Sequence, residues 1–302
     1  MYSEFRSIDG IILIDKPYGL SSHETLQKVK GILKIKKMGH TGTLDPLATG
    51  MLPMCCGRAT KFSQFLMNFK KRYRVIAKLG QKTSTSDSEG QIIHVRPITF
   101  TNLQLQKVLK SFHGKIKQIP SMYSAIKYHG HALYKYARQG IVISRKVRDA
   151  IIYELKVLGY SYKHKYLELD IICSKGTYIR TLIEDVGEKL NCGAHVISLR
   201  RLQVGNYTSF QMIDIKTLNK LVKYNINVLE HILLSVDNAI SCFPEVNIVP
   251  NVIKNLQNGQ KVKTHSGFIN QFVRITEGIN RRFIGIGKIN NINELYSYRL
   301  II

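Results

Sequence analysis

Apolar and polar positions in the larger N-terminal part of the chain follow two different periods. Residues 10–15 form a short apolar run before a turn, and alternate residues are apolar in residues 73–79, which predicts two strands. Residues 151–162 and 165–173 predict a strand pair. In residues 177–190 the apolar side chains recur every three or four positions, which predicts a helix.

Further signals place two more helices and a loop. Ser21 and Glu24 have the spacing of a capping box, so a helix is predicted to begin there. Residues 105–112 carry a second apolar stripe of helical period, and the polar residues 83–90 predict a loop. Because strands outnumber helices and do not alternate strictly with them, the predicted class of the larger domain is mixed α+β.

The pattern changes near Pro244 and Pro250. Beyond these prolines, short apolar runs are separated by glycines, which is typical of a small all-β barrel or sandwich. We therefore predict two domains, residues 1–248 and residues 249–302.

Composition excludes several classes of protein. The chain has 302 residues, of which 44% are hydrophobic, enough for a sizeable core and too many for wholesale disorder. No apolar run reaches the ~18 residues that a membrane span needs, and no secretory signal is readable. The five cysteines are odd in number and lack CxxC spacing, so we expect buried free thiols, no zinc site and a reducing cytoplasm.

The net charge of +25 is the strongest compositional signal. It indicates a polyanionic partner, and nucleic acid is favoured over an anionic membrane surface because no amphipathic basic helix is visible. Residues 251–302 carry +6 of this charge, so the basic character extends over both predicted domains.

One glycine-bracketed loop, at residues 39–53, displays a carboxylate. Asp45 precedes Pro46, which favours an extended backbone at Asp45 and makes its side chain a candidate nucleophile or base. The alternative is an Asp-Pro turn without chemistry. A triphosphate-binding loop is excluded because the GKS/T sequence is missing.

Three other positions could belong to the same site. Arg180, one turn into a predicted helix, can pair bidentately with a carboxylate, or it can belong to a solvated helix face. Tyr73 can stack on a base, or it can be a core aromatic. In residues 118–140, tyrosines alternate with lysine and arginine, which suits unpaired RNA. A half-buried strand followed by an amphipathic helix would give the same pattern.

Taken together and in this order, these stretches closely resemble the bacterial tRNA pseudouridine-55 synthases, the TruB family. The β-rich tail, residues 249–302, resembles the PUA domain of that family, and residues 206–302 are assigned by position and glycine pattern. His23 and Thr43 depart from residues common in the family. The matching blocks lie at residues 15–22, 39–53, 71–80 with 83–91, 119–130 and 173–205.

The resemblance implies a pseudouridine synthase catalytic domain with a mixed, mainly antiparallel sheet and a small PUA-like domain. It implies that a uridine of the tRNA T-loop is flipped out, detached at N1 from C1′, rotated and rejoined through C5. Asp45 would attack C1′ or C6, or act as a base toward the 2′ position. Arg180 would pair with Asp45, and Asp87 would orient Arg180. Tyr73 would stack on the base and help to remove the C5 proton.

The resemblance also implies further substrate-binding residues. His40 would fill the place that the flipped base leaves, and Tyr178 and Leu199 would line the pocket around that base. Lys16 and Pro17 would support the catalytic loop.

The implied partner is tRNA, with no cofactor, metal, membrane or guide RNA, and the expected state is a monomer. An insert at about residues 82–140 would contact RNA, and its TSTSDSEG segment is typical of the stand-alone bacterial form. A role in tRNA folding is expected beside the modification. Two alternatives are an RNA-binding folding factor with incidental catalysis and a guide-dependent pseudouridylase.

Overall fold

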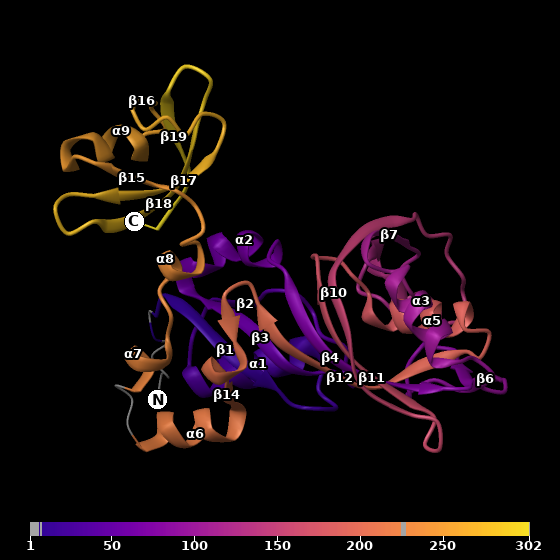
Figure 1. Cartoon of the computed structure of the whole chain (residues 1–302). Helices are drawn as coiled ribbons and strands as arrows, with labels where there is room; N and C mark the ends of the chain where they lie inside the picture. Colours follow the sequence, from indigo (N-terminus) through magenta and orange to yellow (C-terminus); the bar gives the residue numbers. More distant parts are fainter. Residues whose placement is uncertain (1–5, 7, 225–227, 302) are drawn as a thin grey trace.

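A ten-stranded sheet organises the larger part of the chain. The computed structural model describes residue 6, residues 8–224 and residues 228–301 (Figure 1). The main path of the sheet has the order β14-β1-β3-β12-β4-β11-β10-β7, while β2 pairs with β3 and β13 with β12. Its pairings are antiparallel except β1 with β14 and β3 with β12, which confirms the predicted mixed, mainly antiparallel sheet. The strands are β1 (Gly10–Lys16), β2 (Met38–His40), β3 (Thr49–Cys56), β4 (Lys71–Leu79), β7 (Gly114–Gln118), β10 (Arg148–Ser161), β11 (Tyr166–Cys173), β12 (Ala194–Val204), β13 (Tyr207–Thr208) and β14 (Ile213–Asp214).

Helices cover the sheet at several places. Near β1 and β3 both faces of the sheet are covered: Ile12 and Ile14 belong to the core under α1 and α6, while Ile11 and Leu13 belong to the core under α2 and α8. This explains why the β1 segment is a continuous apolar run without alternation. The helices are α1 (Ser22–Leu33), α2 (Ser63–Met67), α3 (Asn102–Lys110), α4 (Leu133–Arg138), α5 (Ile179–Lys189), α6 (Ile215–Tyr224), α7 (Val228–Ile232), α8 (Val236–Ala239) and α9 (Ile253–Gln257).

Local sequence signals agree with the structure at two predicted elements. The Ser21 side chain accepts from the Glu24 backbone N–H, and the Glu24 carboxylate accepts from the Ser21 N–H, so the capping box at the start of α1 is confirmed. In β4, Tyr73, Val75 and Ala77 all point into the same core, as the alternation predicts.

The predicted insert at residues 82–140 is only partly separate from the sheet. Its strand β7 pairs with β10 and forms an edge of the ten-stranded sheet. The rest of the insert consists of α3, α4 and two small hairpins. The hairpin strands are β5 (Gln81–Thr83) with β6 (Ile92–Val95) and β8 (Lys127–Tyr128) with β9 (His131–Ala132).

The C-terminal part forms a second sheet that lies apart from the first in Figure 1. Its order is β15-β17-β18-β19-β16. Because β15 pairs in parallel with β17, this sheet already includes the residues before the boundary expected at residue 248. The strands are β15 (Glu245–Ile248), β16 (Val262–Lys263), β17 (Phe272–Glu277), β18 (Arg282–Ile289) and β19 (Glu294–Leu300).

An aromatic cluster joins the two parts of the molecule. The ring of Phe65, from α2, lies 5.5 Å from that of Phe243, 5.7 Å from that of Phe272 and 6.1 Å from that of Tyr298, measured between centroids. Edge-on contacts of this kind stabilise beyond the apolar area that they bury. The second sheet is therefore fixed to the first through α2.

Two further expectations concern single residues and the membrane. Cys55, Cys56, Cys173 and Cys192 are buried free thiols as expected, but the expectation was wrong for Cys242, which is exposed. Its position in the turn after α8 leaves it outside both cores. Among the helices that the structure describes, none has the length and apolar character needed to cross a membrane.

Candidate active site

A cavity of about 590 Å³ opens where the Asp45 loop faces the N-terminal end of α5. Its wall includes Asp45 from the loop, Tyr73 from β4, Leu199 from β12, and Tyr178 and Arg180 from the start of α5. These five residues come from distant parts of the sequence. The structure therefore brings together most of the residues predicted for catalysis and base binding.

Asp45 lies in the loop between β2 and β3. Gly50, the second residue of β3, has a φ of +98°, and a Cβ there would lie 2.3 Å from the carbonyl oxygen of Arg201. Only glycine fits such a close approach between β3 and β12. The loop is thus anchored to the sheet directly after the segment that carries Asp45.

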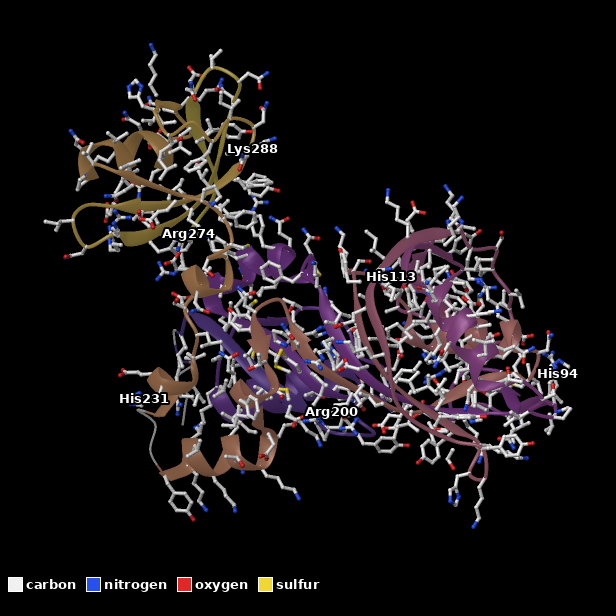
Figure 2. All side chains as sticks on the ribbon, viewed as in Figure 1. His94, His113, Arg200, His231, Arg274 and Lys288 are labelled. Atoms are coloured by element: carbon white, nitrogen blue, oxygen red, sulfur yellow. The ribbon has the colours of Figure 1, made fainter. Side chains whose placement is uncertain are left out.

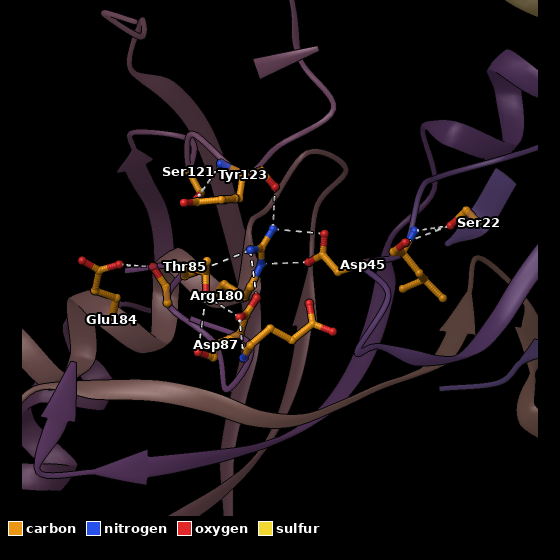
Figure 3. A network of polar contacts seen from close by, with 11 residues as sticks. Ser22, Asp45, Thr85, Asp87, Ser121, Tyr123, Arg180 and Glu184 are labelled. Atoms are coloured by element: carbon orange, nitrogen blue, oxygen red, sulfur yellow. Dashed lines mark hydrogen bonds and ion pairs between the residues drawn. The ribbon is translucent and has the colours of Figure 1, made fainter. Parts of the chain in front are cut away.

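Arg180 holds the Asp45 carboxylate with two of its nitrogens. Its Nε lies 2.8 Å from Oδ2 of Asp45, and its Nη2 donates to Oδ1 at 3.0 Å (Figure 3). This bidentate geometry fixes the plane of the carboxylate as well as its position. The bidentate pairing that the sequence could only suggest is present.

The remaining donors of Arg180 are also used. Nη1 donates to Asp87 Oδ2 at 3.0 Å and to the carbonyl oxygen of Thr85 at 3.1 Å, and Nη2 donates to the carbonyl oxygen of Tyr123 at 2.9 Å. Together with the hydrogen bond and the ion-pair contact to Asp45, these contacts engage all three nitrogens of the guanidinium. Arg180 is therefore locked in one orientation while its side chain is only 6% exposed.

Asp87 is placed by its backbone. It forms an isolated bridge with Val196, and the N–H of Val196 donates to the carbonyl of Ser86 at 3.0 Å, so the polar loop lies along β12. The Asp87 carboxylate also accepts from Thr85 Oγ1. Its side chain is almost fully buried beside Arg180, which is the geometry expected of a residue that orients this arginine.

The electrostatics of Asp45 depend on these neighbours. Desolvation by the cleft walls raises the pKa of the Asp45 carboxyl, the Arg180 guanidinium opposes this shift, and the Asp87 carboxylate adds to it. Asp45 keeps 33% of its side-chain surface exposed. Arg180 thus favours the charged form of a carboxylate that still has an open face toward the cavity.

Aromatic and apolar groups form the wall beside Asp45. Tyr73 and Leu199 are buried against the same core and line the cavity from adjacent strands. Burial raises the pKa of the Tyr73 phenol, so the ring is uncharged at neutral pH, which suits stacking better than base catalysis. The Tyr178 backbone is fixed by Gln118, whose amide both accepts from its N–H at 3.0 Å and donates to its carbonyl at 3.1 Å.

Four predicted residues lie outside the wall of the cavity: Asp87, described above, His40, Lys16 and Pro17. His40 ends β2, and burial lowers the pKa of its imidazole, which is therefore neutral near pH 7. Lys16 is fully buried and its Nζ donates to the carbonyls of Pro17 at 2.8 Å and Pro46 at 3.2 Å. Burial lowers the pKa of Lys16 to about 8. Lys16 therefore contacts the loop at the residue that follows Asp45.

Several residues at this site were not singled out by any sequence pattern. Tyr123 and Thr85 contribute only backbone carbonyls, so their side-chain types carry no signal. Gln118 acts through the backbone of Tyr178, and Arg201 donates from Nε to the Met51 carbonyl at 2.6 Å and from Nη2 to the Gly42 carbonyl at 2.8 Å. These roles depend on which segments meet in the fold, and no spacing in the sequence could have revealed them.

Three protein-family models match this chain. A family model described as TruB family pseudouridylate synthase, N-terminal domain, matches residues 30–179. Models described as the tRNA pseudouridylate synthase B C-terminal domain and as pseudouridine synthase II TruB, C-terminal, match residues 180–241 and 244–301. An arginine-paired aspartate in the cleft of this sheet, with these matches, defines the chain as a pseudouridine synthase. The chain belongs to the TruB family.

Curated relatives cover nearly the whole chain. The tRNA pseudouridine synthase B of Serratia proteamaculans is 50% identical, that of Photorhabdus laumondii is 51% identical, and that of Escherichia coli K12 is 49% identical. Each alignment covers 98% of this chain and 96% of the relative. The predicted family is thereby confirmed.

Solved structures share the fold at lower identity. A chain of a Cbf5-Nop10-Gar1 complex superposes with a TM-score of 0.75 at 24% identity, covering 97% of this chain and 85% of that chain. A chain of an H/ACA RNP bound to a substrate RNA gives a TM-score of 0.71 at 22% identity, with the same coverage. The architecture of both sheets is therefore shared with these chains.

Proposed function

We propose that this pseudouridine synthase isomerises uridine 55 in the T-loop of tRNA. The N1–C1′ bond breaks, the detached uracil rotates, and a C5–C1′ bond forms. The proton leaves C5 and N1 ends protonated, so the reaction consumes no co-reactant. The names of the relatives support tRNA as the substrate, and the family resemblance of the sequence motifs supports the T-loop position.

The observation that carries this proposal is the state of Asp45. Both of its oxygens are held by Arg180, yet a third of its side-chain surface remains open to the cavity. An ionised, oriented and accessible carboxylate can attack C1′ or C6, and it can equally remove a proton at the 2′ position. Each of these routes requires the carboxylate at the same place.

The surroundings of Asp45 support a flipped nucleotide as the ligand. Tyr73 and Leu199 offer an aromatic and an apolar surface for one base, and the cavity exceeds the size of a single base. Lys175 and Arg148 line the same cavity, which suits the phosphates on either side of that base. Unstacking costs a few kcal/mol, and His40 would offset part of this cost by filling the vacated stack.

We expect this chain to recognise tRNA without another protein or a guide RNA. Two observations support a stand-alone, monomeric enzyme without guide RNA or cofactor. The net charge is +25, and the match covers 96% of the length of a relative named tRNA pseudouridine synthase B. An additional role in tRNA folding stays a prediction.

The test uses an unmodified tRNA transcript and the purified chain. We expect pseudouridine at uridine 55 only, mapped by a pseudouridine-specific chemical method, and we expect tritium release from C5-labelled uridine. Asp45→Asn should lower turnover at least ~10³-fold while filter binding of tRNA is retained, because the amide is neither a nucleophile nor a base.

Asp149→Asn is the matched control. Asp149 also lines the cavity, from β10, but the acids that pair with Arg180 are Asp45 and Asp87. Its replacement should leave turnover within a few-fold of the wild type. Substantial tritium release by a folded Asp45→Asn protein would remove Asp45 from the reaction, and modification at another uridine would refute the T-loop assignment.

A further inference from the structure

Ser22 makes an unusual pair of contacts with the residue that precedes Asp45. Its Oγ accepts a hydrogen bond from the Leu44 N–H at 2.8 Å and donates one to the Leu44 carbonyl oxygen at 2.9 Å (Figure 3). The hydroxyl thus satisfies both polar groups of one residue's backbone. Ser22 is only 2% exposed and Leu44 only 4% exposed, so neither backbone group has easy access to water.

The helix that carries Ser22 does not need this hydroxyl. Ser21 already caps α1 by accepting from the Glu24 N–H, and Glu24 completes the box. Ser22 occupies the first helical position, and its side chain leaves the helix toward the loop. Because α1 is packed into the core through Leu26 and Val29, the hydroxyl is presented from a rigid element.

The residue after Asp45 is held in the same manner. The Pro46 carbonyl accepts from Lys16 Nζ at 3.2 Å and from the Gly19 N–H at 2.9 Å. The stretch from Lys16, at the end of β1, to Ser22, at the start of α1, therefore contacts the chain on both sides of Asp45. Ser22 and Lys16 hold the backbone next to Asp45, while Arg180 holds its carboxylate.

We propose that Ser22 is a positioning residue for Asp45. By holding the Leu44 backbone it fixes where the Asp45 side chain leaves the main chain, and so where the carboxylate oxygens meet the bound nucleotide. This proposal rests on the proposed role of Asp45. It assigns to the serine a function in the reaction geometry that neither helix capping nor tRNA binding requires.

Loss of the hydroxyl has a defined consequence. Ser22→Ala leaves the buried N–H and carbonyl of Leu44 without their partner, and the loop must shift to find others. Misplacement of a reacting group by ~1 Å can cost about 10²-fold in rate. We therefore expect kcat to fall at least ~10-fold, with KM and the Kd for tRNA unchanged because contacts with the RNA are not touched.

The matched control is Thr25→Val. Thr25 is also fully buried on α1, and its Oγ1 donates to the Ser21 carbonyl at 2.8 Å, away from the Asp45 loop. Both substitutions remove one buried hydroxyl from the same helix, so both lower the melting temperature. Only Ser22→Ala should lower kcat, and Ser22→Thr, which restores a hydroxyl, should recover much of the loss.

The assay is tritium release under saturating tRNA, with filter binding and thermal melting for each variant and Asp45→Asn in parallel. If Asp45→Asn is inactive while the separate Ser22→Ala protein keeps the wild-type kcat, only the proposed role of Ser22 is overturned. An active Asp45→Asn would overturn the proposed function itself. If Ser22→Ala does not fold, Ser22→Cys, which keeps a weak donor of similar size, carries the same comparison.

Discussion

Two arginines in this molecule each bind two carboxylates, and they lie in regions with different tasks. Arg180, in the cleft, pairs with Asp45 and Asp87. Arg274, on β17, pairs with Asp237 of α8 at 2.7 Å and with Glu245 of β15 at 3.1 Å. Figure 2 places Arg274 where the second sheet meets the rest of the chain.

The difference lies in what surrounds each pair. Arg274 connects α8 to the second sheet, next to the aromatic cluster of Phe65, and also donates to the Phe243 carbonyl at 3.2 Å. Arg180 holds a carboxylate that lines a cavity. An arginine between two acids, one of them partly exposed, is therefore no indication of a reactive site by itself, since Asp237 is 34% exposed and Asp45 33%. What distinguishes Asp45 is that it lines a cavity.

The strongest test of this comparison replaces each arginine by methionine. Arg180→Met removes both bonds to Asp45 and leaves a desolvated carboxyl whose charged form is no longer favoured. We expect kcat to fall on the order of 10³-fold. Arg274→Met should leave kcat within about threefold, since Arg274 reaches no group in the cavity. Tritium release from labelled tRNA measures both.

Either of two results would break the comparison. Comparable losses of kcat in both folded variants would mean that the junction between the sheets controls the cleft. A fully active Arg180→Met protein would mean that Asp45 does not need its partner. Circular dichroism before each assay separates these outcomes from unfolding.

A smaller effect is expected at the junction itself. The Arg274 side chain is 16% exposed and its acids are partly exposed, so its removal should lower the free energy of unfolding by about 1–2 kcal/mol. In a chain of this size that corresponds to about 2–4 °C in Tm. Thermal melting should show this loss. Arg281→Met, which removes a more exposed partner of Glu245, should show much less.

Sequence patterns predicted those parts of the fold that local chemistry determines. The capping box at Ser21 and the alternation of β4 depend on residues close in sequence, and both are confirmed. The domain boundary was harder to predict, because β15 has only four residues and belongs to the second sheet through its pairing with β17. Strand β7 joined the large sheet for the same reason.

The residues of the site also divide into those that the sequence could identify and those that depend on long-range contacts. Asp45, Tyr73 and Arg180 were identifiable because their motifs resemble a known family. Ser22 was visible only as part of the block at residues 15–22 that resembles the family, since its contact with Leu44 joins residues 22 positions apart. Gln118 contacts the backbone of Tyr178 across 60 positions. Such side chains bind backbone groups, and a sequence does not show which backbone comes near.

The smallest effect on kcat is expected at Asp87, and it tests how the charge of this residue acts on Asp45. Asp87 anchors Arg180, but its negative charge also contributes to the raised pKa of Asp45. Asp87→Asn keeps an acceptor for Arg180 and removes this charge, so we expect kcat at the plateau to fall no more than ~10-fold. Because the proposed reaction needs ionised Asp45, we expect kcat/KM to decline as the pH falls through the pKa of that carboxyl. Without the Asp87 charge this pKa drops, and the acid limb should move to lower pH.

Glu89→Gln is the control for that pH profile. Glu89 lies on the same loop, and its charge and that of Asp45 repel each other, but Asp87, not Glu89, binds Arg180 and is among the largest contributions to the raised pKa of Asp45. The acid limb of Glu89→Gln should therefore move less than that of Asp87→Asn. Profiles of kcat/KM must be recorded at constant ionic strength, because binding of tRNA by a chain of this charge is itself sensitive to salt. An acid limb that moves upward in Asp87→Asn would show that anchoring Arg180 outweighs the charge of Asp87. Asp87 would then favour ionised Asp45 rather than oppose it.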